Sequence, residues 1–175
     1  MVLNTRRCNT QRRGSAMVEF CFAGIASITV LIGTFQLSMG MWNYHTLAFK
    51  VHEATRYIAV HGKGCTKYGN TCSVTVGTLA HKIDSTGVGI LSNSVDVTLT
   101  TDSLAETRCW PLSSCFSNTT VWPPATNTDN EPGKKVTIFA NYQYHSALFF
   151  FWPGAGSMAF GQIWLPASST QTIVY

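Results

Sequence analysis

A long apolar run dominates the hydrophobic pattern near the start of the chain. From Phe20 to Phe49 there is no Lys, Arg, Asp or Glu. A helix needs about 20 mostly apolar residues to cross a bilayer, so the run predicts one transmembrane helix over residues 15–42. Trp42 and Tyr44 follow at its end, and such aromatic rings favour the membrane–water interface. The apolar core of a cleaved secretory signal is shorter, about 7–15 residues.

Beyond this run, apolar residues continue on one helical face only. They recur at steps of four, three and four: Leu47, Val51, Ala54 and Ile58. Polar and charged residues occupy the other faces: Lys50, His52, Glu53 and Arg56. Gly62 and Gly64 end the pattern, as glycines do at helix C-termini. The pattern predicts one helix from Ser15 to His61, about 70 Å long, whose amphipathic extension over 43–62 packs on a folded domain.

The remaining residues, 63–175, predict a small α+β head. Helical spacing of Val76, Leu79, Ala80 and Ile83 predicts a short second helix. Strict alternation of apolar and polar residues predicts strands over 95–100 and 136–144. Residues 103–135 contain four prolines and many Ser, Thr and Asn residues, which predict a long loop with little regular structure. The apolar stretch 147–152 is too short to span a bilayer and predicts a core strand or an interface patch.

Charge is concentrated ahead of the apolar run. The formal net charge is +4, but four of the twelve Lys and Arg residues precede Gly14, and the other eight are balanced by eight Asp and Glu. A basic leader of this kind is not a basic surface on a fold, so nucleic-acid binding is disfavoured. By the positive-inside rule, the leader places the N-terminus in the cytoplasm and the head outside.

The cysteines of the head form two close pairs. Cys65 and Cys72, and then Cys109 and Cys115, lie in Gly-, Ser- and Thr-rich sequence. Close pairs in loops favour local disulfides in an oxidising compartment. Zinc is the alternative, but these spacings are looser than the usual C-x2–4-C ligand pair. We therefore expect two disulfides and no metal.

Glu19 is the residue whose position most strongly indicates a functional role. An ionisable group inside a membrane span costs roughly 2.5–3.5 kcal/mol on an insertion scale, and Glu19 lies at the start of the uncharged run, five residues after Gly14. A plain signal anchor explains the arginines and the apolar run but gives Glu19 no role. A carboxylate close enough to the interface to reach water is the other ordinary explanation.

Motifs for catalysis are missing from the sequence. The five histidines form neither H-x-x-x-H nor H-E-x-x-H, and there is no G-x-S-x-G nucleophile motif. There is no G-x-x-x-x-G-K-[ST] phosphate loop, so any energy for assembly comes from another protein. We expect a protein that is not an enzyme and carries no cofactor.

Three segments resemble a known family. The first is Arg13-Gly14-Ser15-Ala16-Met17-Val18-Glu19-Phe20. The second is Ala54-Thr55-Arg56-Tyr57-Ile58-Ala59-Val60, and the third is Val136-Thr137-Ile138-Phe139-Ala140-Asn141-Tyr142, followed by Leu148-Phe149-Phe150. Together they resemble the TadE-like minor pilins, or pseudopilins, of the tight-adherence (Tad/Flp) type IV pilus. The two cysteine pairs and the Pro-rich loop depart from that pattern.

The resemblance implies a fold and a processing site. The expected fold is type IV pilin-like: a long N-terminal helix, transmembrane and then a stalk, packed on a small antiparallel β-sheet head. A prepilin peptidase is expected to remove the leader, residues 1–14, by cutting between Gly14 and Ser15. A glycine has no side chain to block the approach of the peptidase carboxylates.

The resemblance also implies an assembly role for Glu19 and Phe20. Glu19 would pair with the new N-terminal ammonium of a neighbouring subunit, since a paired carboxylate is tolerable in lipid. Expected partners are the peptidase, other pilin and pseudopilin subunits and the inner-membrane assembly platform. The expected location is the bacterial inner membrane, with a single span and a periplasmic head, or the pilus or cell surface after assembly. Pilus biogenesis, adhesion or biofilm formation is the implied function.

Two other functions compete with this one. The first is an unprocessed single-pass envelope protein whose outer domain binds a ligand or a partner. The second is an anchored periplasmic enzyme, which the lack of a catalytic constellation disfavours. Cleavage after Gly14 separates the pilin interpretation from the unprocessed envelope protein.

Overall fold

The computed structural model describes residues 12–65, 72, 74–124, 128–146 and 162–174. The chain divides into an N-terminal unit, Met1–Ser38, and a C-terminal unit, Met39–Tyr175. Each unit is described by itself below. The predicted apolar stretch 147–152 lies outside the described residues.

One uninterrupted helix, α1 (Arg12–Ala59), runs through the first part of the chain. This confirms the prediction of a single long helix, which begins three residues earlier and ends two residues earlier than expected. The segment contains no proline, and the glycines inside it are outnumbered by strong helix formers. Continuous helix therefore connects the apolar run to the amphipathic extension.

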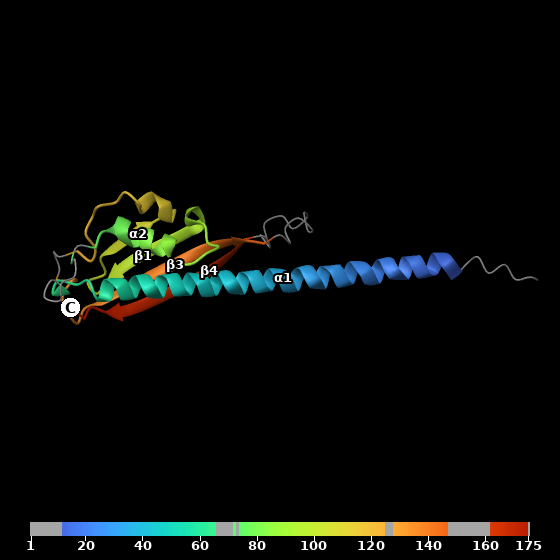
Figure 1. Ribbon diagram of the computed structural model, residues 1–175, viewed down its shortest axis with the longest axis horizontal. Helices are drawn as coiled ribbons and strands as arrows, with labels where there is room; N and C mark the ends of the chain where they lie inside the picture. The colour runs from blue at the N-terminus through green and yellow to red at the C-terminus, as the bar shows by residue number, and fades with distance from the viewer. Residues whose placement is uncertain (1–11, 66–71, 73, 125–127, 147–161, 175) are drawn as a thin grey trace, which may run out of the picture. The chain divides into compact units, whose positions relative to one another are not determined.

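A four-stranded antiparallel sheet forms the centre of the C-terminal unit, in the order β2-β1-β3-β4 (Figure 1). The strands are β1 (Val95–Thr101), β2 (Glu106–Cys109), β3 (Lys135–His145) and β4 (Gln162–Thr172). Strands β1 and β3 confirm the two strands predicted from alternation, and the α+β class is confirmed with them.

The two edge strands were not predicted. β2 lies inside 103–135, where the sequence predicts a loop, and it pairs with β1 over only four residues, from Thr100↔Glu106 to Val97↔Cys109. β4 lies in the C-terminal tail, which shows no clear period, and it carries Pro166 opposite Asn141. Proline is tolerated at a sheet edge because its missing N–H is not needed for pairing there.

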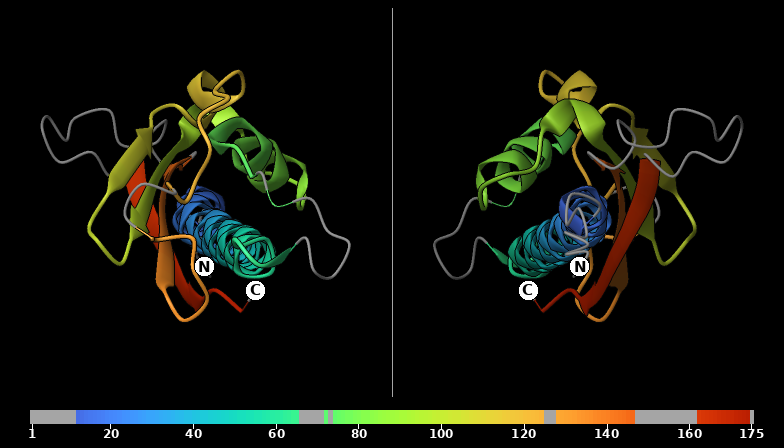
Figure 2. Two further views of the ribbon diagram at one scale, coloured as in Figure 1. Left: turned by 90° about the vertical axis from the view of Figure 1, so that its left-hand side faces the viewer. Right: turned by 90° about the vertical axis from the view of Figure 1, so that its right-hand side faces the viewer.

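Two helices cover the same face of the sheet. They are α1, from Met39 onwards, and α2 (Val76–Ser85), which confirms the predicted second helix (Figure 2). The predicted apolar face of α1 is fully buried, with Leu47, Val51, Ala54 and Ile58 all at 0% exposure. Alternate residues of the sheet complete this core: Val95, Val97, Leu99, Val136, Ile138, Ala140, Tyr142 and Tyr144.

The start of α2 is fixed by a side-chain cap and a close backbone contact. Thr75 is the N-cap, and its hydroxyl accepts a hydrogen bond from the Thr78 N–H at 3.1 Å. The Gly77 N–H donates to the Asn118 carbonyl at 2.8 Å. This contact joins α2 to the loop that follows η3 (Leu112–Cys115), a short 3-10 helix.

Candidate functional site: the apolar segment of the first helix

Residues 16–38 of α1 present large apolar side chains on every face. Ten of them between Met17 and Leu37 are more than half exposed: Met17, Val18, Phe20, Phe22, Ile25, Ile28, Val30, Leu31, Phe35 and Leu37. A helix that is hydrophobic all round is normally buried, in a protein core or in a membrane. An apolar medium or a partner is therefore needed to cover this segment.

The polar side chains of the same segment bond to their own helix. The hydroxyls of Ser27, Thr29, Thr34 and Ser38 each donate to the carbonyl four residues earlier, at 2.5–2.9 Å. Such bonds satisfy a hydroxyl without water, as is required in a hydrocarbon environment. With a window of mean hydropathy 2.0, α1 is long and apolar enough to cross a membrane.

The residues of the predicted processing and assembly site lie in the first turns of α1. Gly14 and Ser15 have helical backbone. Glu19 is exposed one to two turns later, and Phe20 beside it is 77% exposed. None of the ion pairs among the described residues involves Glu19.

Both cysteine pairs form disulfides. Cys65–Cys72 links two residues that follow α1 in the chain, and its sulfurs are 1.93 Å apart. Cys109–Cys115 joins the end of β2 to η3, and its sulfurs are 1.99 Å apart. The second bond fastens an edge strand of only four residues to the loop beside it. Cys21 is a free, exposed thiol within the apolar segment.

The position of Lys50 differs from the one expected from the sequence. The pattern assigns it to a polar face of the helix, but its side chain is buried, with 2% of the residue exposed. Its Nζ donates to the Asp84 carbonyl at 3.1 Å, in the last turn of α2. Burial lowers the pKa of Lys50, and the Asp84 charge partly opposes that shift. A cation suits this position because the carbonyls of a helix C-terminus carry partial negative charge.

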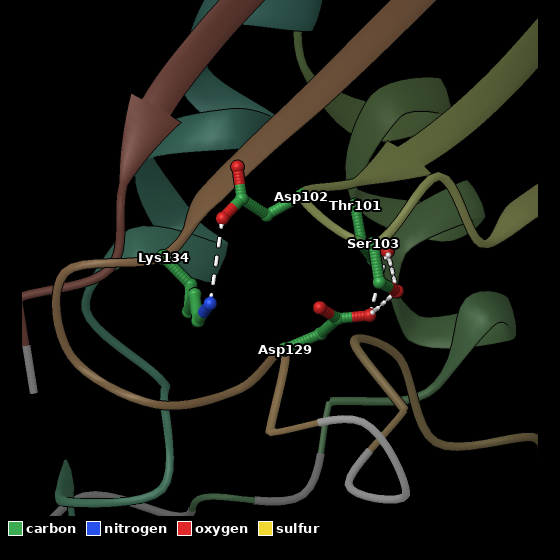
Figure 3. A network of polar contacts seen from close by, with 5 residues as sticks. All are labelled: Thr101, Asp102, Ser103, Asp129 and Lys134. Carbon is green, nitrogen blue, oxygen red and sulfur yellow. Dashed lines mark hydrogen bonds and ion pairs between the residues drawn. The ribbon is translucent and has the colours of Figure 1, made fainter.

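A buried acid that was not predicted from the sequence links the end of β1 and the turn after it to the loop before β3. Asp129 is 1% exposed, and its Oδ2 accepts hydrogen bonds from the hydroxyls of Thr101, at 2.7 Å, and Ser103 (Figure 3). Lys134 pairs with Asp102 at 3.5 Å beside it. The partners lie about 28 residues apart in sequence, and no motif connects them.

The pKa of Asp129 reflects these contacts. Burial alone raises it, but the hydrogen bonds from Ser103 and Thr101 and the charge of Lys134 outweigh burial, so the pKa lies below its ordinary value. The preceding residue, Thr128, has a φ of 60°, which is unfavourable for a β-branched residue. The Asp129 bonds hold the chain in this turn.

Within the part of the chain that the structure describes, there is no group of three or more His, Cys, Asp and Glu residues able to hold a metal. Three of the described histidines contact aromatic rings, among them His45, whose ring lies edge-on to Tyr44. His81 stacks on Phe116 with ring centroids 4.4 Å apart, and His61 lies 4.1 Å from Tyr57. His52 Nδ1 lies 3.4 Å from the Ser169 hydroxyl, which connects α1 to β4. These contacts are of the kind that stabilise a fold.

Comparison with known proteins found no relative. No family model, no curated protein and no solved structure matches this chain. The functional argument therefore rests on the residues of α1 and on the fold to which that helix is joined.

Proposed function

We propose that this chain is a TadE-like minor pilin or pseudopilin of a Tad/Flp-type pilus. The observation that carries the proposal is Glu19, the first charge after a basic leader and Gly14, at the start of a 30-residue uncharged stretch of α1. The same helix continues into the core of a small α+β unit. A subunit that is stored in a membrane and then extracted into a fibre needs both parts.

Processing is the first step of the proposed function. A prepilin peptidase cuts the bond between Gly14 and Ser15, which removes the four arginines of the leader. The arginines hold the leader at the anionic cytoplasmic face before the cut. The scissile bond lies in the first turn of α1, where backbone N–H groups have no partner within the helix and the chain opens most readily.

Assembly is the second step. The cut produces an ammonium group on Ser15, and the Glu19 carboxylate of a neighbouring subunit pairs with it. In lipid this pairing stabilises both charges, so it favours one register between adjacent helices. The exposed apolar residues of 16–38 then pack against other subunits instead of lipid. The assembly platform of the inner membrane supplies the energy.

The disulfides of the C-terminal unit support a location outside the cytoplasm. Two disulfides are typical of proteins outside the cytoplasm. This agrees with the orientation that the leader arginines favour, in which the N-terminus stays inside. We place the C-terminal unit in the periplasm, and at the pilus or cell surface after assembly.

The N-terminus of the mature protein tests the proposal. Mass spectrometry of the membrane fraction should find a chain that starts at Ser15. Gly14→Val should block the cut, because a branched side chain hinders the approach to the scissile bond. Gly24→Val is the matched control, since its position has open space around it and lies away from the cut. An intact chain starting at Met1, in cells with an active prepilin peptidase, would instead support an unprocessed envelope protein.

A further inference from the structure

The connection between α2 and β1 lies against α1 where that helix enters the C-terminal unit (Figure 1). A Cβ on Gly89 would be 3.9 Å from the Trp42 indole nitrogen and 3.8 Å from Asn43 Oδ1. A Cβ on Gly87 would be 3.2 Å from the Thr46 methyl group. The connection thus contacts residues 42–46 of α1, in the last part of its uncharged stretch.

Two glycines shape this connection so that one apolar side chain projects from it. Gly87 and Gly89 have φ values of +92° and +100°, which L side chains rarely adopt. Val88, between them, is 83% exposed. Ile90 turns inward to the core at 9% exposure, and Leu91 turns outward at 70% exposure. Ile90 therefore anchors the connection in the core, while Val88 and Leu91 are exposed.

Charge is missing from both segments that meet here. Residues 85–95 contain no Lys, Arg, Asp or Glu, like residues 20–49 of α1. Lys50, the first charge after the uncharged stretch of α1, points into the protein and bonds to the Asp84 carbonyl. Trp42 is 64% exposed next to the connection. We call Trp42, Val88 and Leu91 the loop patch: an uncharged apolar surface adjoining the end of the apolar run.

We propose that the loop patch inserts into the membrane interface, so that the lipid surface is its partner. The inference rests on the proposed function, in which the apolar run of α1 spans the bilayer. A span that ends near Trp42 places this indole at the headgroup level, where Trp is favoured. Val88 and Leu91 belong to the connection that contacts residues 42–46, and they gain by leaving water. Two separate contacts with the bilayer, the helix and the loop patch, hold the C-terminal unit in one orientation before assembly.

Nitroxide labelling of the full-length chain in liposomes of bacterial phospholipids tests the proposal. Cys8→Ser and Cys21→Ser provide a background without free thiols, and the disulfides stay oxidised. A single cysteine label is then placed by Val88→Cys or by Leu91→Cys. Power saturation compares the access of each label to oxygen, which concentrates in lipid, and to a water-soluble nickel complex. Near-UV circular dichroism checks that each labelled chain is folded.

Val174→Cys is the matched control. It replaces an exposed valine of the same unit, 57% exposed, whose backbone N–H bonds to the Ala59 carbonyl at the other end of α1. Labels at 88 and 91 should show a severalfold higher ratio of oxygen to nickel access than the label at 174. Equal ratios would overturn the proposal. Low access to both reagents at 88 and 91 would also overturn it, because the patch would then be covered by protein.

A label on native Cys21, in a Cys8→Ser chain, separates this proposal from the proposed function. Cys21 lies in the apolar segment and is exposed. If its label is in lipid while those at 88 and 91 are in water, the loop patch proposal fails and the membrane span stands. If the Cys21 label is also in water, both fail.

Discussion

At the scale of single residues, Gly77 shows how a missing side chain joins two segments. Its backbone lies so close to the loop of residues 115–118 that a Cβ would be 2.6 Å from the Phe116 carbonyl oxygen and 2.8 Å from that of Asn118. Both neighbours are backbone atoms, which cannot rotate away as a side chain can. Glycine is required here because the two backbone segments lie so close together, and not because the residue has a positive φ.

We expect Gly77→Ala to destabilise the C-terminal unit by about 1–3 kcal/mol, because the added methyl forces the helix and the loop apart. Thermal unfolding in detergent, followed by near-UV circular dichroism, measures the loss. Gly33→Ala is the control, since a Cβ there meets nothing within 4 Å. Equal stability of the two variants would contradict the packing described for α2.

Asp129 leads to a prediction about pH. Its pKa in the folded protein is lowered by the hydrogen bonds from Ser103 and Thr101, which outweigh the opposing effect of burial. A folded-state pKa below the unfolded value means that the ionised carboxylate stabilises the fold. This stabilisation is complete above the unfolded pKa of about 3.9 and is lost as the pH falls through the folded pKa.

Asp129→Asn should therefore be less stable than the wild type at pH 7, by about 1–2 kcal/mol, and this difference should shrink below about pH 4. Urea unfolding at pH 7 and at pH 3 measures it. Asp102→Asn serves as the comparison, because the exposed pair of Asp102 with Lys134 is worth less than about 1 kcal/mol. If Asp129→Asn lowered the free energy of unfolding by the same amount at both pH values, the charge of Asp129 would not be the cause of the loss.

At the scale of elements, α1 changes character along its length without a break. Its first part exposes apolar residues on every face, whereas from Asn43 onwards one face is buried and the others are mixed. The buried side of α1 belongs to the same hydrophobic core as the inward-pointing residues of β1, β3 and α2. The helix is thus a part of the core of the C-terminal unit and not merely a tether to it.

We expect Leu47→Ala to cost about 2–5 kcal/mol, because Leu47 is fully buried and a cavity remains. Phe49→Ala, two residues later and 58% exposed, should change stability by less than about 0.5 kcal/mol. The measurement is the midpoint of chemical unfolding of the C-terminal unit, within the intact protein in detergent. Similar losses for both variants would mean that the α1 face is not packed as described.

At the scale of the whole molecule, the proposed function separates storage in the membrane from assembly. In the proposed scheme, the apolar segment suffices for insertion, and the leader with Gly14 suffices for recognition by the peptidase. Glu19 contributes to neither step in this scheme. Its contribution begins when a second subunit supplies an ammonium group.

Glu19→Leu should therefore insert and be cut after Gly14 as the wild type is, but leave surface pili reduced or absent. Insertion should not suffer, because a carboxylate opposes transfer into lipid. Glu19→Asp keeps the charge with a shorter reach and should retain partial assembly. Immunoblots of sheared fibres and of membranes measure both steps. Normal piliation by Glu19→Leu, with the subunit present in the fibres, would remove the main support for the pilin proposal.

Periodicity along the chain was enough to predict the elements that carry their own signal. The amphipathic extension of the long helix, α2, β1 and β3 each repeat apolar residues at a spacing typical of one kind of element, and the first part of the helix is recognised by its uncharged length. The pairing of each cysteine with its neighbour in sequence could also be predicted, because a short loop brings the two together regardless of the rest of the fold. The candidate assembly residue, Glu19, followed from the cost of a charge in an apolar run.

Tertiary structure alone decided the rest. β2 and β4 have weak patterns and exist because β1 and β3 offer them unpaired edges. Lys50 is buried because the last turn of α2 supplies a carbonyl for its ammonium group, and Asp129 is buried because Thr101 and Ser103 supply hydroxyls. The loop patch likewise depends on α2 bringing residues 87–89 beside Trp42. Local periodicity reports which face of an element is apolar, whereas these features depend on partners that lie far away in the sequence.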